Sequence, residues 1–163
     1  QALQALTGLL EQLLLRLWDC DEDCPSSDDD DWEPKVQLPK RPSKSSSKKL
    51  ATNLLADGKT KREPDTDAHH IVPGNAKWAE EARNILKKFG IDIDEKVNGI
   101  FLPHNMAAKA KHGYPGVPHA NLNTKKYSQN VTALLRKAVT RAQVEKFLKE
   151  IAAKLANNTF VYK

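Results

Sequence analysis

The sequence predicts a small α+β domain over residues 60–163. Two short runs, residues 68–72 and 99–102, have the length and the β-branched or aromatic composition of strands. Longer segments between and after them repeat apolar residues at helical spacing. No apolar run of the chain approaches the roughly 20 residues that a membrane span requires. The expected fold is therefore two short strands surrounded by amphipathic helices.

The first expected strand, residues 68–72, leads into a helix expected around residues 76–89. Asn75 stands where an N-cap belongs and Gly90 where a C-cap belongs. The helix has apolar residues on one face, namely Trp78, Ala79, Ala82, Ile85, Leu86 and Phe89. A turn and the pair Asn98-Gly99 then precede the second strand.

A Gly/Pro-rich loop, residues 111–118, separates the second strand from a helix that begins near His119 or Asn123. That helix has an apolar stripe of Tyr127, Val131, Leu134, Leu135 and Ala138. Thr140 and Gln143 have the spacing of a capping box and predict the start of a last helix. Residues 159–163 are expected to form a closing strand.

The segments before residue 60 differ in composition from the domain. Residues 1–18 predict an amphipathic leucine-rich helix, either the end of a parent protein or a packing helix. Residues 19–59 have the composition of a linker, acidic at first and then basic and rich in Pro and Ser. The chain begins at Gln1 and its only methionine is Met106, so we expect it to be part of a longer polypeptide.

Charge is divided unevenly along the chain. Residues 1–33 contain ten acidic residues and one basic residue, whereas residues 34–163 contain eleven acidic and twenty-five basic residues, a net charge of +14. A basic domain favours an acidic partner, with nucleic acid the first candidate. The cysteines Cys20 and Cys24 predict a local disulfide or two free thiols in the linker.

The candidate chemistry centres on the sequence "DAHHIVP", residues 67–73. His69 and His70 alone would be read as one core and one surface histidine. Further along the chain, Asn98 precedes the second strand, and His119 and Asn123 are four residues apart at an expected helix start. That spacing puts both side chains on one helical face, where they can bind one ion.

The motifs "AHHIVP" (68–73), "NGIFLP" (98–103) and "HANLNTKKYSQNV" (119–131) appear in this order. Together with the helix at 79–94, they resemble the His-Asn-His nucleases of the HNH/endonuclease VII (His-Me finger) superfamily. The resemblance is specifically to the AHH branch, found as C-terminal toxin domains of bacterial polymorphic toxins. It implies a small ββα-metal core within the α+β domain.

The resemblance also implies residue roles. His70 would be the general base, His69, His119 and Asn123 the metal ligands, and Asn98 the residue that orients the base and its loop. Asn123 departs from the family, where His is common at this position. It is alternatively a helix N-cap, in which case His112 or Asp67 would complete the metal shell. Asn98 is alternatively part of an Asn-Gly turn with positive φ.

Other residues have accessory roles in this interpretation. Tyr127 is expected to pack or to position the site from its helix, and His104 to lie at the surface. His112, in a flexible loop, and Lys125 and Lys126 are candidates for contact with substrate. Further basic residues would bind phosphates without sequence preference: Lys87, Lys88, Lys109, Lys111, Arg136, Lys137 and Arg141.

The expected activity is metal-dependent hydrolysis of nucleic acid, DNA before RNA. The cofactor is one divalent ion, Mg²⁺ first, with Mn²⁺, Zn²⁺ or Ni²⁺ as alternatives. The resemblance implies a toxin exported from one bacterium and active in the cytoplasm of another, a carrier polypeptide, and a cognate immunity protein. The net charge of +14 predicts that this immunity protein is acidic. The alternatives are an RNA-cleaving toxin of the same fold, a basic nucleic-acid-binding module with a structural metal, and a membrane-active toxin that uses residues 1–18.

Overall fold

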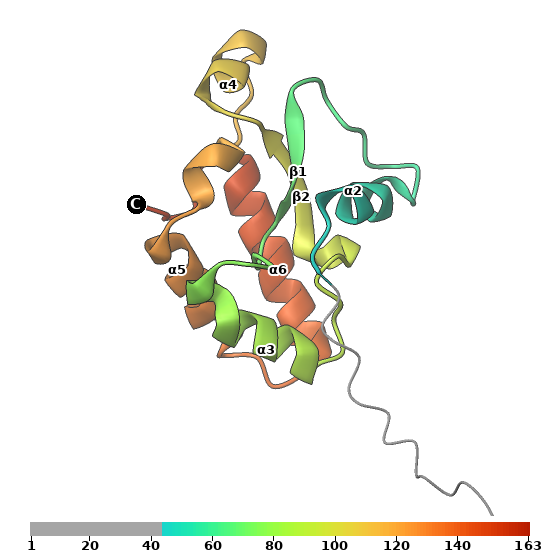
Figure 1. Ribbon diagram of the computed structural model, residues 1–163, viewed down its shortest axis with the longest axis vertical. Coiled ribbons are helices and arrows are strands. Elements are labelled where there is room, and N and C mark those ends of the chain that lie inside the picture. Colours follow the sequence, from blue (N-terminus) through green and yellow to red (C-terminus); the bar gives the residue numbers. More distant parts are fainter. Residues whose placement is uncertain (1–43) are drawn as a thin grey trace, which may run out of the picture. The chain divides into compact units, whose positions relative to one another are not determined.

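The computed structural model describes residues 44–163. The leucine-rich helix, Cys20, Cys24 and the acidic segment expected before residue 44 lie outside the described residues. Two strands and their flanking helices form the domain (Figure 1). In chain order the elements are α2 (Ser47–Leu55), β1 (Thr66–His70), η1 (Lys77–Ala79), α3 (Glu80–Lys88), η2 (Lys96–Asn98), β2 (Gly99–Pro103), α4 (Met106–His112), η3 (His119–Leu122), α5 (Lys125–Leu135) and α6 (Arg141–Ala156). The α+β class expected from the sequence is confirmed.

Strands β1 and β2 form an antiparallel two-stranded sheet. Residues that face each other across an antiparallel pair lie on the same side of the sheet. One side carries the pairs Asp67–Leu102 and His69–Ile100, and the other carries Ala68–Phe101 and His70–Gly99. Alternation along β1 therefore sends neighbouring side chains to opposite sides.

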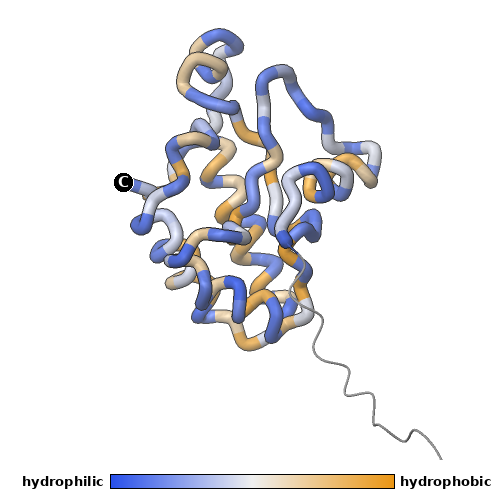
Figure 2. Tube along the Cα trace, in the orientation of Figure 1, coloured by the Kyte–Doolittle hydropathy of each residue, from blue (hydrophilic) through white to orange (hydrophobic). Residues whose placement is uncertain are grey.

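Helices cover both sides of the sheet, with α2 on one side and α6 on the other (Figure 1). The main hydrophobic core lies on the α6 side and includes Leu102, Leu148 and Ile151. A smaller core on the α2 side contains Leu50, Leu54 and Ala68. The connection between α2 and β1 is mostly hydrophilic, as Figure 2 shows.

Helix α2 differs from the sequence prediction, because the sequence predicts a linker through residue 59. Leu50 and Leu54 are almost fully buried against the sheet. Ser46 caps the helix by accepting a hydrogen bond from the Lys49 backbone N–H. A Cβ built on Gly99 would lie 2.5 Å from Leu50 Cδ1, so any larger residue there would force the Leu50 side chain to shift. The domain therefore includes residues that precede the expected boundary.

The other expected elements are shifted or missing in places. The first strand occupies 66–70 rather than 68–72, and the expected helix at 76–89 is a 3-10 turn followed by α3, without a side-chain cap from Asn75. The helix α4 was not expected, because "MAAKAKH" carries no apolar stripe. The expected strand at residues 159–163 is wrong, since this segment is irregular and contributes a buried Phe160 to the core.

The final helix begins as expected. Thr140 accepts a hydrogen bond from the Gln143 backbone N–H, and the Gln143 side chain accepts one from the Val139 N–H. Gly90 has φ of +71°, the left-handed conformation that glycine tolerates directly after a helix. None of the helices within residues 44–163 is long and apolar enough to cross a membrane.

Candidate functional site

His69 and His119 are brought together from elements far apart in the chain. The Nδ1 atoms of their two rings lie 3.0 Å apart, and the rings meet edge to face. His69 lies in β1, whereas His119 begins the 3-10 helix η3. The structure therefore unites two of the three residues that the sequence suggested as metal ligands.

Tyr127 fixes the orientation of His69 from helix α5. Its hydroxyl lies 2.9 Å from His69 Nε2 and donates a hydrogen bond of 2.8 Å to the carbonyl of Ile71. A hydroxyl has one proton, so its oxygen must accept from the Nε2–H of His69. The lone pair of His69 is then on Nδ1, the atom that faces His119. Tyr127 is fully buried, and its hydroxyl contacts the interior groups His69 and the Ile71 carbonyl.

Burial favours the neutral form of both imidazoles. Desolvation lowers the pKa of His69 to about 3, with smaller contributions from His119 and His70. Desolvation also lowers the pKa of His119, partly opposed by the carboxylate of Asp67. The neutral ring is the form that binds a metal.

The His69–His119 pair fits a divalent ion. Bonds between Zn²⁺ and imidazole nitrogen are about 2.0–2.1 Å long, so two nitrogens 3.0 Å apart can both reach one ion. The bond from His69 to Tyr127 is the outer hydrogen bond that metal-binding histidines usually make. Within residues 44–163, no group of three or more His, Cys, Asp or Glu side chains is placed to hold a metal. Of the suggested ligands, the structure brings together His69 and His119.

Asn123 is placed differently from the sequence expectation. The 3-10 helix that begins at His119 ends at Leu122, and α5 begins only at Lys125 with Thr124 as its N-cap. Asn123 therefore shares no α-helical face with His119 and is not the cap of α5. Its side chain is exposed, and its role as a ligand stays a prediction.

His70 points to the opposite side of the sheet, towards a carboxylate that the sequence did not suggest. Its Nε2 lies 2.8 Å from Oδ1 of Asp94. Within the described residues the Nδ1 of His70 has no hydrogen-bond partner, and it is not among the buried polar atoms that lack one. The ring thus has one tethered nitrogen and one that is accessible.

Asn98 holds together the backbone behind the two histidines. Its side-chain oxygen accepts from the N–H of Val72, and its amide nitrogen donates to the carbonyls of Ile93 and Val72. The residue is fully buried. The alternative of an Asn-Gly turn with positive φ is wrong, because Gly99 has φ of −138°. These contacts tie the segment after β1 to the turn before β2, and the role of Asn98 in orienting the base stays a prediction.

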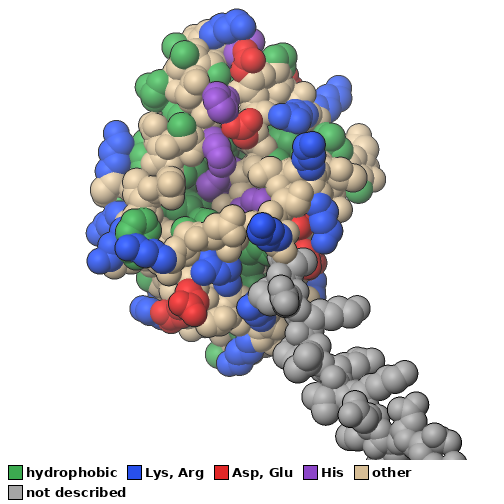
Figure 3. Space-filling model, viewed as in Figure 1, with side chains coloured by type: hydrophobic (Ala, Val, Ile, Leu, Met, Phe, Trp, Pro, Cys, Tyr) green, Lys and Arg blue, Asp and Glu red, His purple; other side chains and the backbone are tan. Residues whose placement is uncertain are grey.

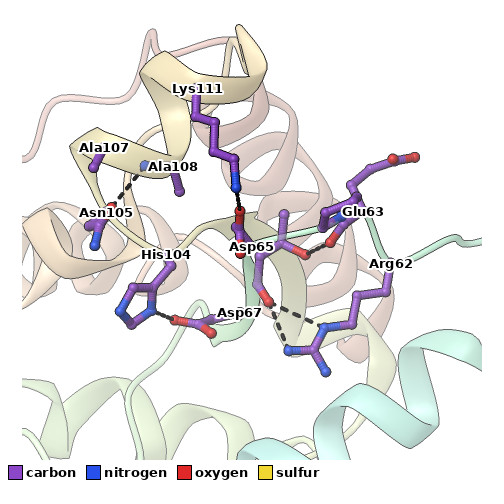
Figure 4. Close-up of a pocket in the computed structure, with 11 residues that line it drawn as sticks. Arg62, Glu63, Asp65, Asp67, His104, Asn105, Ala107, Ala108 and Lys111 are labelled. Carbon is purple, nitrogen blue, oxygen red and sulfur yellow. Dashed lines mark hydrogen bonds and ion pairs between the residues drawn. The ribbon is translucent and has the colours of Figure 1, made fainter.

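A row of histidine and acidic side chains continues from this site over the surface of the domain (Figure 3). His104 donates to Asp67 at 2.5 Å, and Asp65 accepts from His112 and from Lys111. A pocket of about 840 Å³, shown in Figure 4, is lined by Asp65, Asp67, His104 and Lys111 but not by His112.

His104 and His112 both belong to this row. His104 is exposed as predicted, but it is paired with Asp67. His112 is the last residue of α4 rather than part of a flexible loop, and its ring stacks on Tyr114. The Nε2 of His112 is bound to Asp65, and contact of this residue with substrate stays a prediction.

Among the basic residues expected to bind phosphate, some are already bonded to other groups of the protein and others are not. Arg136 is bound to Glu81, and Arg141 to Glu95 and Glu145. Lys109 donates to backbone carbonyls. Lys125 and Lys126, at the start of α5, are exposed and form no ion pair within residues 44–163.

Comparison with known proteins supplies the family. The family model described as AHH, a nuclease family of the HNH/ENDO VII superfamily with conserved AHH, matches residues 50–158. Comparisons with curated proteins and with solved structures give no significant match. Nucleases of this superfamily generally use a divalent metal. The matched residues span most of the chain and contain His69, His70, Asn98 and His119, and the chain therefore belongs to the AHH family of HNH/endonuclease VII nucleases, endonucleases that hydrolyse phosphodiester bonds.

Proposed function

We propose that this nuclease holds one divalent ion at His69 and His119 and uses His70 as the base that takes a proton from the attacking water. The observation that carries the proposal is the approach of the two Nδ1 atoms to 3.0 Å, with the tautomer of His69 set by Tyr127. The ion would stabilise charge on the phosphate and on the departing oxygen. Mg²⁺ is the first candidate, with Mn²⁺, Zn²⁺ and Ni²⁺ as alternatives.

The division of roles follows from strand alternation. His69 faces His119 and Tyr127, whereas its neighbour faces the other side of the sheet. The side chain of His70 is about one-tenth exposed, and its Nδ1 is accessible. Imidazole is suited to general-base catalysis because it titrates near neutral pH. In this proposal the buried His69 binds the ion, and the accessible His70 takes the proton from the water.

The proposed substrate is DNA, cleaved with little sequence preference. The described residues contain twenty-two basic and eleven acidic side chains, a net charge of +11. Lys125 and Lys126 lie at the start of α5, the helix that carries Tyr127 to the site. Contacts of such lysines with phosphate depend on salt and carry no sequence information. RNA is the alternative substrate.

The biological role that we propose is that of a toxin. It would be delivered from one bacterium into the cytoplasm of another as the C-terminal part of a carrier protein. A basic nuclease surface calls for an acidic immunity protein, because opposite charges accelerate association and improve specificity. Reversing the acidic charges of a cognate inhibitor should reduce its association rate at low salt; an unchanged rate would contradict this part of the proposal.

One experiment tests the substrate and the cofactor together. Purified full-length protein is incubated with supercoiled plasmid or with structured RNA, in Mg²⁺, Mn²⁺, Zn²⁺ or Ni²⁺, or with a chelator. We expect nicked and linear plasmid only when a divalent ion is present. Preferential cleavage of RNA would replace DNA as the substrate. Binding without cleavage under every condition would favour a nucleic-acid-binding module instead.

A further inference from the structure

The carboxylate of Asp94 is hydrogen-bonded to His70, the proposed base. Its Oδ1 lies 2.8 Å from Nε2 of His70, and a carboxylate can only accept, so Nε2 carries the proton. The accessible Nδ1 then carries the lone pair. This is the tautomer that a base needs if Nδ1 is to receive a proton from water.

The burial of Asp94 is unusual for a carboxylate in a turn between two elements. The residue is fully buried. Its Oδ2 is the one buried side-chain polar atom within the described residues that has no hydrogen-bond partner. The Nζ of Lys49 is 3.8 Å from it, within ion-pair distance but beyond a hydrogen bond. Buried polar atoms that lack a partner are rare, and each calls for an explanation, of which a catalytic role is one.

The N-terminal part of the described chain holds this carboxylate in place. The backbone N–H of Ser46 donates to Oδ1 of Asp94 at 2.8 Å. The side chain of Asn53 donates to the backbone carbonyl of Asp94 at 2.7 Å. Both residues belong to α2 or its cap, and Leu50 anchors that helix to the sheet. Helix α2 and its cap thus form hydrogen bonds with both the side chain and the backbone of Asp94.

We propose that Asp94 is a positioning residue that sets the tautomer and orientation of His70, and that α2 with its cap Ser46 is part of the catalytic machinery through this carboxylate. The inference rests on the proposed role of His70 as base. Ser46 and Lys49 lie just before residue 50, where the family match begins. The segment before the AHH match therefore contributes to activity through contacts with Asp94.

The test uses full-length protein and four variants. Asp94→Ala removes the acceptor, and Asp94→Asn keeps the shape and one acceptor oxygen but permits the other tautomer. Asn53→Ala removes the hydrogen bond from Asn53 to the backbone carbonyl of Asp94. Asp92→Asn is the matched control, because it removes the same charge two residues away and retains the oxygen that accepts from the Asp94 N–H. For each variant kcat and KM on plasmid, Mn²⁺ affinity and the tautomer of His70 by ¹⁵N NMR are measured.

We expect kcat to fall at least tenfold in Asp94→Asn and Asp94→Ala, in line with the roughly 10–100-fold effects of partners that orient site histidines. The kcat of Asn53→Ala should fall less, and the kcat of Asp92→Asn should stay near that of wild type. KM and Mn²⁺ affinity should change less than about twofold, since neither Asp94 variant touches His69 or His119. In wild type His70 should be the Nε2–H tautomer, and in Asp94→Ala a mixture of the two.

The outcomes separate this inference from the proposed function. Wild-type kcat in Asp94→Asn, or an Nδ1–H tautomer of His70 in wild type, overturns the inference even if metal-dependent cleavage stands. Loss of Mn²⁺ affinity along with kcat also overturns it, because Asp94 would then act on the whole site. If wild type cleaves nothing, the proposed function fails, and the tautomer of His70 still shows whether Asp94 positions it. If Asp94→Ala does not fold, Asp94→Asn and the wild-type spectrum decide.

Discussion

His69 and His119 point their Nδ1 atoms at each other across 3.0 Å, although 50 residues separate them in the chain. The hydroxyl of Tyr127 occupies the other nitrogen of His69. With the lone pair of His69 on Nδ1, the Nδ1–H of His119 donates to it, and in the proposed function a divalent ion between the two rings would take the place of this proton.

The first prediction concerns metal binding. His119→Ala removes one of two converging nitrogens and should weaken Mn²⁺ binding at least tenfold, as measured by titration calorimetry on the purified protein. His112→Ala is the matched control, because His112 is bound to Asp65 at the end of α4. Equal Mn²⁺ affinity in both variants would place the ion elsewhere.

Tyr127→Phe tests the outer contact of the metal pair. The substitution keeps the buried ring but leaves the Ile71 carbonyl and the Nε2–H of His69 without their partner. We expect the free energy of unfolding to fall by about 1–3 kcal/mol, and Mn²⁺ affinity to fall about 10–100-fold. Urea unfolding and metal titration measure the two effects.

Tyr114→Phe is the control for this substitution. The Tyr114 hydroxyl also donates to a backbone carbonyl, that of Pro64, but at the exposed side of the domain. Tyr114→Phe should lower the free energy of unfolding less than Tyr127→Phe does, and it should leave the Mn²⁺ affinity unchanged. If Tyr127→Phe behaved like Tyr114→Phe in both measurements, the positioning role of Tyr127 would be wrong.

The third prediction is a pH dependence of the metal-free protein. Burial lowers the pKa of His69 to about 3, whereas histidine in an unfolded chain titrates near 6.5. Between these values the unfolded state binds a proton that the folded state does not. The free energy of unfolding should therefore fall as pH drops from about 6.5 towards 3, by up to about 1.4 kcal/mol per pH unit.

The lowered pKa of His119 acts in the same direction. The measurement is urea unfolding at a series of pH values in a chelator. His69→Gln cannot take up this proton, so its stability should depend less steeply on pH in the same window. Parallel pH profiles for wild type and His69→Gln would show that His69 is not the buried neutral group.

Asn98→Ala tests the support of the loop behind the histidines. The change leaves the Val72 N–H and the Ile93 carbonyl unpartnered in the interior. At about 1–3 kcal/mol for each buried group left without a partner, we expect a loss of about 2–4 kcal/mol in the free energy of unfolding. Asn84→Ala, on the exposed face of α3, should change stability little. Similar unfolding midpoints for the two variants would contradict the account.

Much of the fold could be predicted from local patterns, and the exceptions have physical causes. The second strand and the start of α6 follow from apolar composition and from capping residues. The sequence predicts a linker in place of α2, because only Leu50 and Leu54 mark the buried face of this helix in a Ser- and Lys-rich stretch. Residues 159–163 look like a strand by composition, but the sheet within the described residues has no third member for them.

The candidate site divides in the same manner. His69, His119 and Tyr127 could be suggested because their residue types and order match the family motifs. Asp94 could not, because it lies in a turn 24 residues from His70 and its role depends on a tertiary contact. The expected pairing of His119 with Asn123 assumed an α-helix, whereas the chain forms a 3-10 turn there and starts α5 two residues after Asn123.

The most direct test of the account separates the two adjacent histidines. Mn²⁺ affinity and kcat for plasmid cleavage are measured for wild type, His69→Ala and His70→Ala. We predict that His69→Ala loses metal affinity and activity together. His70→Ala should keep its Mn²⁺ affinity within about twofold while kcat falls at least 100-fold, the usual contribution of a general base. Full activity in His70→Ala, or a loss of metal binding in that variant, would contradict the central claim.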